Sequence, residues 1–497
     1  MSEVVASYRR ILKSSSIIGG ASVLNILIGL VRTKLLAVFL GPSGIGLAGL
    51  YTALITTVSA VATMGVGTTG TRQFAQAHSQ GDQRALAVTR RAMFWCSLVL
   101  AITGALVVWL FRDFLAVLVL GSGTHATTVG WLALGVGLSV ASSSQAALIQ
   151  GMRRIGDMAR LSVYGSVFNT LLGVGLIWQL GQEGLLAYVL VGPLGSFMLG
   201  HWYVSRLPKM VSGPIPIREM ALHWKTLLRL GLPFMAAGLA ASLGQLWIRV
   251  EVGNTLGTEA LGHFQASWAI SAQYITFVLS AISADYYPRL AGVINDHKAA
   301  SRLVNEQTEI ALLLSAPIFI AMAGLAPWVI DLLYSAAFAP AVSVLRWQIL
   351  GDLLKVASWP LAYVILASGA GKEYFVAQSI VWLVIGASVA IFSDSFGLPM
   401  AGIAYLLGYI IYLPLVYWLA RKNIGFKWSG PVAKLLTAIL ATCLAVEFME
   451  FNYGWGSIVA VMLSVIYLIY AVIRLGRLGN LGGKVGEMIA KMKMRAF

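Results

Sequence analysis

The chain has 497 residues, of which 58% are hydrophobic and only 11% are charged. Its mean hydropathy is +0.82. Soluble globular proteins do not have this composition, so the sequence predicts an all-α polytopic membrane protein. The formal net charge is +16. In a soluble protein this excess would suggest a nucleic-acid partner, but here the basic residues lie between apolar runs, which is typical of membrane topology.

The first apolar run, residues 14–40, is long enough to cross a hydrocarbon core of about 30 Å. It is too long for the apolar part of a signal peptide and has no cleavage site, so we interpret it as a retained first span. Apolar runs bounded by Gly, Pro and charged residues predict about fourteen spans in all. Their expected ranges are 14–40, 44–68, 93–112, 129–150, 161–181, 184–204, 230–255, 260–284, 306–326, 341–367, 374–393, 400–420, 432–451 and 456–474.

Most of the Lys and Arg residues fall in every second connection between these spans, beginning with Arg9, Arg10 and Lys13 before the first span. These connections all lie on the same side of the membrane. The opposite loops are short and hold mainly acidic residues, such as Glu183 and Asp331. The positive-inside rule therefore predicts a multi-pass protein with both termini in the cytoplasm.

An internal repeat is indicated because segment 40–54 aligns without gaps with segment 256–270. Gly41 coincides with Gly257, and Gly46 with Gly262. Two six-helix lobes of the same orientation would be related by a pseudo-two-fold axis along the membrane normal. The expected organisation is an N-terminal lobe (1–204), a cytoplasmic linker (205–229), a C-terminal lobe (230–420), an extra helix pair (432–474) and a basic amphipathic cytoplasmic tail (475–497).

Several cations lie inside predicted spans, where a charge costs roughly 2.5–3.5 kcal/mol. At about 1.5 Å per residue, Arg32 lies roughly 12–14 Å from the end of its span, and Arg249 lies at a similar depth in the seventh. Together with Lys34 and Lys355 they are candidate cavity cations, and Asn25 shares a helix face with Arg32. Such a cavity would suit an anion, because arginine matches the geometry of phosphate oxygens. The alternative is that these cations only pair with acids or reach the membrane surface, which is our interpretation of Arg346.

Two acids inside spans, Glu251 and Asp352, are candidates for binding a coupling ion, H+ or Na+. Asp352 lies three residues before Lys355 and can pair with it, and a structural ion pair is an equal alternative for Glu251. The two cysteines lie in apolar runs, which argues against a disulfide framework. No metal-ligand spacing, phosphate-binding glycine loop or nucleophile motif occurs, so we expect no catalytic residue, metal or cofactor.

The pattern of Asn25, Arg32 and Lys34 followed by LGPSGIG at 40–46 resembles the oligosaccharide flippases of bacterial polysaccharide biosynthesis, the O-antigen translocases. Their superfamily also holds the multidrug and toxin extruders and the peptidoglycan lipid flippase. The resemblance implies an inner-membrane transporter, not an enzyme, that moves undecaprenyl-diphosphate-linked oligosaccharide by alternating access. It implies a cationic central cavity that includes Arg32, Lys34 and Arg249. Membrane lipids and other polysaccharide-assembly proteins are the further partners expected.

Two alternatives belong to other functional classes. A cation-coupled multidrug antiporter of the same superfamily would require embedded acids and aromatic residues, whereas cations prevail here. A membrane glycosyltransferase or polymerase would require catalytic acids in a sizeable outer loop, and the outer loops are short.

Overall fold

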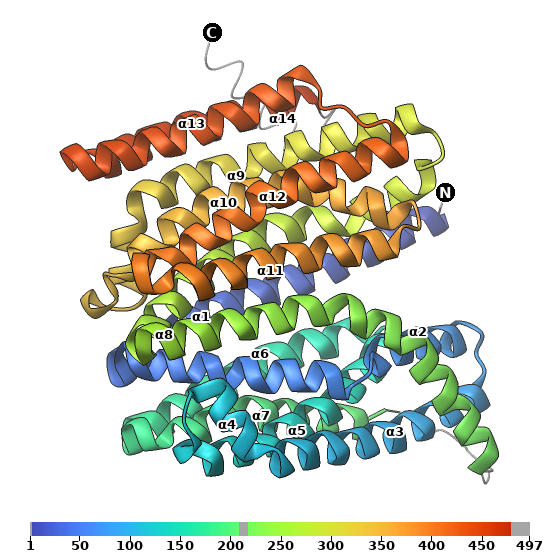
Figure 1. Ribbon diagram of the computed structural model, residues 1–497. Helices are drawn as coiled ribbons and strands as arrows, with labels where there is room; N and C mark the ends of the chain where they lie inside the picture. Colours follow the sequence, from blue (N-terminus) through green and yellow to red (C-terminus); the bar gives the residue numbers. More distant parts are fainter. Residues whose placement is uncertain (1, 208–216, 479–497) are drawn as a thin grey trace. The chain divides into compact units, whose positions relative to one another are not determined.

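The computed structural model describes residues 2–207 and 217–478, and all regular structure in these ranges is helical (Figure 1). This confirms the all-α prediction. The described chain forms two compact units, Met1–Gly262 with Leu333–Ala337, and His263–Leu332 with Phe338–Phe497. Residues 479–497 of the predicted tail (475–497) lie outside the described residues, while 475–478 belong to the last described helix. Residues 217–229 of the predicted linker are helical.

The first unit contains seven helices and most of an eighth. They are α1 (Ser2–Ala62), α2 (Val66–Ser79), α3 (Gln83–Leu110), α4 (Arg112–Leu120), α5 (Ala126–Gly151), α6 (Ile155–Leu180), α7 (Leu185–Ser205) and the part of α8 (Ile217–Val293) that ends at residue 262. Within this unit α5 packs between α3 and α7, and α6 packs against both α1 and α7. The short 3₁₀ turn Gly181–Gly184 joins α6 to α7, and the two helices pack against each other as an antiparallel hairpin.

The second unit holds the remainder of α8 and the six helices that follow. They are α9 (His297–Leu333, of which the last residue belongs to the first unit), α10 (Ala341–Ala367), α11 (Gly371–Phe396), α12 (Pro399–Ile424), α13 (Gly430–Tyr453) and α14 (Gly456–Leu478). Here α12 packs against α10 and α11, while α13 packs against α10 and α14.

Ten stretches of the described helices are long and apolar enough to cross a membrane. Two of them, Gly19–Ala62 and Ile155–Ser205, are 44 and 51 residues long, which is sufficient for two passages each. The polytopic membrane fold is therefore confirmed, while the number fourteen stays a prediction.

Glycine interrupts the two longest helices at corresponding positions of the repeat. Gly41 in α1 has φ 64° and ψ −174°, and Gly257 in α8 has φ 89° and ψ 170°. A positive φ of this kind is unfavourable for residues that have a Cβ. Segments 40–54 and 256–270, aligned from the sequence, thus begin with the same backbone break.

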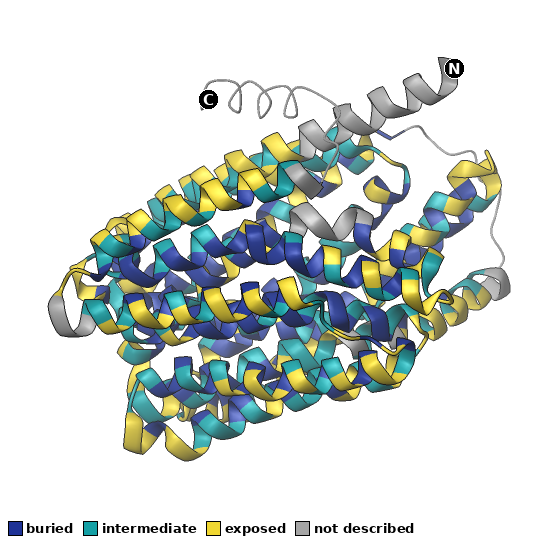
Figure 2. Cartoon of the chain, turned by 90° about the horizontal axis from the view of Figure 1, so that it is seen from above, coloured by how far each residue is buried: buried dark blue, intermediate teal, exposed yellow. Residues whose placement is uncertain are grey.

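Burial separates core helices from lipid-facing ones within the second unit. In the most apolar 18-residue stretch of α10, 78% of the residues are buried, whereas in that of α14 only 11% are buried. Exposed side chains of α14 include Val465, Ile469 and Ile473, all apolar. Figure 2 shows such exposed residues along the outer faces of many helices. An apolar exposed face of this extent is what a protein dissolved in a bilayer requires.

Ion pairs attach the last helix pair to the rest of the second unit. Arg346 of α10 lies 3.1 Å from Glu447 and 3.9 Å from Glu450, both in α13. Arg474 of α14 pairs with Glu309 of α9 at 2.7 Å. Arg346 therefore pairs with acids, as the alternative to a cavity role predicts, because two carboxylates of a neighbouring helix hold its guanidinium.

Candidate functional site

The polar residues of α1 face α6 and α7 inside the first unit. Asn25 Nδ2 donates a hydrogen bond of 2.7 Å to Ser162 Oγ of α6. Its Oδ1 is buried and accepts no hydrogen bond from the described residues. Arg32, half-buried, lies close enough to Tyr188 of α7 to act on its hydroxyl electrostatically. The face that carries Asn25 and Arg32 therefore points at two neighbouring helices.

A second amide lies beside Tyr188. The ring of Tyr188 packs over Gly173, where an added Cβ would lie only 2.8 Å from ring atom Cδ2. Asn169 Oδ1 is 3.3 Å from the same Cβ position, and this buried oxygen has no hydrogen-bond partner among the described residues. Tyr188 and Asn169 thus form a polar region between α6 and α7, and the Arg32 guanidinium of α1 acts electrostatically on the Tyr188 hydroxyl.

Arg249 is only 6% exposed, although it lies in an apolar part of α8. Its Nη1 donates to the Gln245 carbonyl oxygen of the same helix at 2.9 Å. Lys34 on α1 is half-buried. Glu251, two residues after Arg249, accepts a hydrogen bond of 3.3 Å from Thr255 Oγ1. These residues lie in the first unit, so that unit holds three of the four candidate cations.

Asp352 is the centre of a hydrogen-bonded network in the second unit, and it has no exposed surface. Its Oδ2 accepts from Ser271 Oγ and from the Tyr274 hydroxyl of α8, both at 2.6 Å. Its Oδ1 accepts from the Tyr405 hydroxyl of α12 at 2.7 Å. Lys355 Nζ donates to the same Tyr405 oxygen at 3.1 Å. The predicted association of Asp352 with Lys355 is therefore indirect, through Tyr405.

Three hydroxyls surround the Asp352 carboxyl, and all three can donate to it when it is ionised. Lys355 supplies the compensating charge, and its ammonium also lies 5.7 Å and 5.8 Å from the ring centroids of Tyr405 and Tyr409. A buried ion pair is tolerated when its remaining lone pairs are satisfied in this way.

The sequence alone did not indicate the tyrosines that complete the polar region around Asn169 and the network around Asp352. Tyr405, Tyr409 and Tyr412 lie at helical spacing on one face of α12. That spacing, opposite a span containing Asp352 and Lys355, is the signal that could have identified them. Tyr188 has no such signal, since it stands alone in an apolar span.

A family model described as "Polysaccharide biosynthesis protein" matches residues 35–343. The curated protein "Lipid III flippase" of Escherichia coli (strain K12) is 25% identical to the chain over 422 residues. The alignment covers 83% of the chain and 99% of that protein.

Solved structures share the fold at lower sequence identity. "Lipid II flippase MurJ, inward closed conformation" has a TM-score of 0.69 at 13% identity, covering 94% of this chain and 99% of that one. An inward-facing multidrug resistance MATE family transporter of the MOP superfamily has a TM-score of 0.66 at 17% identity. That match covers 82% of this chain and 96% of the transporter.

Proposed function

The chain belongs to the polysaccharide biosynthesis protein family, and from this premise we propose that it moves an undecaprenyl-diphosphate-linked glycan across the bacterial inner membrane. Its relatives are named flippases and transporters, which confirms the prediction of a transporter of the MOP superfamily and not an enzyme. The glycan class, an O-antigen-type repeat unit, and the direction, from the cytoplasmic to the periplasmic leaflet, are part of the proposal.

The observation that carries the proposal is the placement of Arg32 and Arg249 inside membrane helices. Arg249 is almost completely buried, and Arg32 is half-buried on the helix face from which Asn25 bonds to Ser162 of α6. A guanidinium away from bulk water attracts an anion strongly, because the local dielectric is low. The diphosphate that joins a glycan to its polyprenyl carrier is an anion of matching geometry. In the proposed cycle the diphosphate binds these cations while the polyprenyl chain remains in lipid.

Energy for the cycle is proposed to come from the membrane potential or from an ion that moves in the opposite direction. Asp352 is our candidate for binding that ion, and Glu251 is the second candidate. A proton on Asp352 would cancel its negative charge and turn one acceptor oxygen into a donor, so its arrival would alter the bonds to the three hydroxyls and, through Tyr405, to Lys355. Two protonation states with different hydrogen bonds are what coupling to a conformational change would require of this network.

The test of the anion site replaces Arg32 or Arg249 with glutamine. Glutamine retains hydrogen-bonding capacity but removes the charge, so we expect loss of surface glycan at an unchanged protein level. Arg112→Gln is the matched control, because this arginine is 38% exposed and lies beside Asp113 at a helix end. Normal surface glycan in Arg32→Gln and Arg249→Gln cells would refute the site.

The substrate is identified by depleting the protein and measuring lipid-linked intermediates by mass spectrometry. Accumulation of an undecaprenyl-diphosphate glycan supports the proposal. The buried Asp352 and the MATE-like fold favour a second candidate, a cation-coupled multidrug antiporter. Drug sensitivity without lipid accumulation would favour that antiporter.

A further inference from the structure

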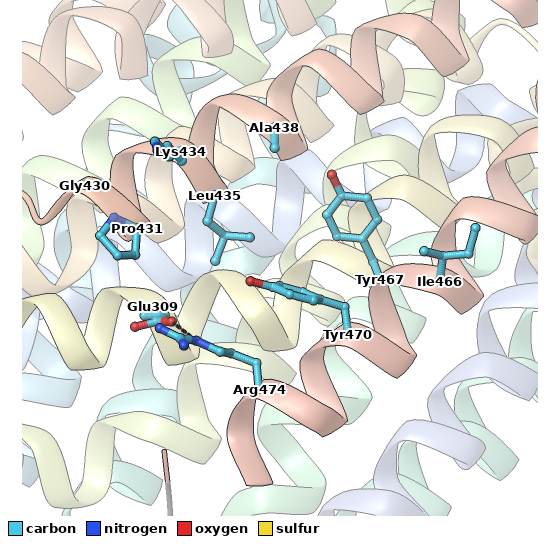
Figure 3. Close-up of a pocket in the computed structure, with 10 residues that line it drawn as sticks. All are labelled: Glu309, Gly430, Pro431, Lys434, Leu435, Ala438, Ile466, Tyr467, Tyr470 and Arg474. Atoms are coloured by element: carbon cyan, nitrogen blue, oxygen red, sulfur yellow. Dashed lines mark hydrogen bonds and ion pairs between the residues drawn. The ribbon is translucent and has the colours of Figure 1, made fainter. Parts of the chain in front are cut away.

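A pocket of about 640 Å³ lies among α9, α13 and α14 (Figure 3). Its lining includes Glu309, Lys434, Ala438, Ile466, Tyr470 and Arg474. Its volume is within the roughly 300–1,000 Å³ range of small-ligand sites. We propose that this pocket binds the phosphate headgroup and upper acyl chains of an anionic glycerophospholipid.

Charge is the first argument for this occupant. Arg474 and Lys434 line the pocket against a single carboxylate, Glu309, so the lining carries one net positive charge. The Arg474 Nε donates to Glu309 Oε1 at 2.7 Å, and this bond fixes the guanidinium at the pocket wall. Lys434 is exposed and forms no ion pair with any described residue. A phosphodiester, with one negative charge, balances this lining, whereas a diphosphate diester carries two.

The second argument is the division of the pocket into a polar and an apolar part. In Figure 3 the Glu309–Arg474 pair and Lys434 lie toward one end, and Ala438 and Ile466 lie toward the other. Tyr470 projects from α14 between these two parts. The Tyr467 hydroxyl, near Ala438 in Figure 3, is engaged with Thr442 Oγ1 at 3.0 Å, one turn of α13 farther from the polar end. A molecule with an anionic head and an apolar chain fits this order of side chains.

The third argument is position relative to the bilayer. The pocket opens where α13 begins and α14 ends, close in sequence to the basic residues Arg421, Lys422 and Lys427. The positive-inside rule predicts that this end faces the cytoplasm, where the leaflet contains anionic lipids. Basic pockets between membrane helices on that side are suited to anionic headgroups. The inference does not depend on which substrate the protein transports.

The test is a lipid titration of the purified full-length protein in neutral detergent, read by native mass spectrometry. Phosphatidylglycerol is the probe and phosphatidylcholine the neutral comparison. We expect Lys434→Gln to weaken phosphatidylglycerol binding at least fivefold and to leave phosphatidylcholine binding unchanged. Lys427→Gln is the matched control, because it removes an exposed lysine at the same end that does not line the pocket.

A second variant tests position independently of charge. Ala438→Phe adds a ring to the apolar part of the pocket, so we expect it to weaken binding of phosphatidylglycerol by a similar factor. Equal losses of phosphatidylglycerol affinity in Lys434→Gln and Lys427→Gln would overturn the proposal, since they would indicate a general effect of positive charge and not a site. An unchanged affinity in Ala438→Phe, or stoichiometric displacement of phosphatidylglycerol by undecaprenyl diphosphate, would overturn it as well.

Discussion

Tyr405 is the residue on which the buried ion pair of the second unit depends. Its hydroxyl donates to Asp352 and accepts from Lys355, so one oxygen atom connects both charges. Phenylalanine would preserve the ring and remove that connection. We expect Tyr405→Phe to lower the free energy of unfolding by about 1–3 kcal/mol, the cost of leaving buried polar groups without partners. Thermal unfolding in detergent measures this loss.

The same helix provides a control for that substitution. Tyr412 is also buried, but its hydroxyl has no hydrogen-bond partner among the described residues. Removing a hydroxyl that is already unsatisfied should be neutral or stabilising. If Tyr412→Phe and Tyr405→Phe lowered stability equally, the loss would reflect packing of α12 and not the bridge.

At the scale of elements, close packing of two glycines joins the corresponding segments of the repeat. Gly46 in α1 and Gly262 in α8 are equivalent positions, and both lie in the first unit. A Cβ on Gly46 would lie 2.7 Å from the Gly262 nitrogen, and a Cβ on Gly262 would overlap the Pro42 carbonyl. The two backbones therefore approach as closely as glycine allows.

This approach predicts a specific sensitivity to one methyl group. We expect Gly262→Ala to destabilise the protein by about 1–3 kcal/mol, because a backbone carbonyl cannot yield as a flexible side chain can. Gly238→Ala in the same helix is the control, since no atom lies within 4 Å of its added Cβ. There the better helix propensity of alanine, worth about 1 kcal/mol, should prevent any loss. Equal behaviour of the two variants in thermal unfolding would contradict the packing argument.

The helices and the glycine breaks were predictable because they depend on local sequence. Long apolar runs specify spans, and LGPSGIG at 40–46 marks an interruption that the structure places at Gly41. Side-chain partners were less predictable, since they depend on which helices become neighbours. Arg346 illustrates this limit: its partners Glu447 and Glu450 lie in a helix whose docking position has no signature in the sequence around Arg346. The three hydroxyls around Asp352 come from two further helices for the same reason.

For the whole molecule, the proposed cargo makes transport sensitive to membrane potential. A potential of 100 mV is worth about 2.3 kcal/mol per elementary charge, or roughly a 50-fold change in an equilibrium ratio. An inside-negative potential would favour outward movement of an anionic diphosphate. The charges of Arg32, Lys34 and Arg249 do not leave with the cargo, so the net charge transferred per cycle is that of the cargo together with any coupled ion.

The measurement uses the full-length protein in vesicles that contain a lipid-diphosphate-linked glycan, with potential and pH gradient imposed separately. We expect an imposed potential to shift the distribution of the glycan between leaflets even when the pH is equal on both sides. If Asp352 also binds a coupling proton, a pH gradient alone will drive transport. Asp352→Asn will then abolish the transport driven by the pH gradient, while the response to the potential remains. Transport that responds to neither gradient, in vesicles shown to hold both, would exclude an electrogenic and a proton-coupled cycle together, leaving only facilitated equilibration.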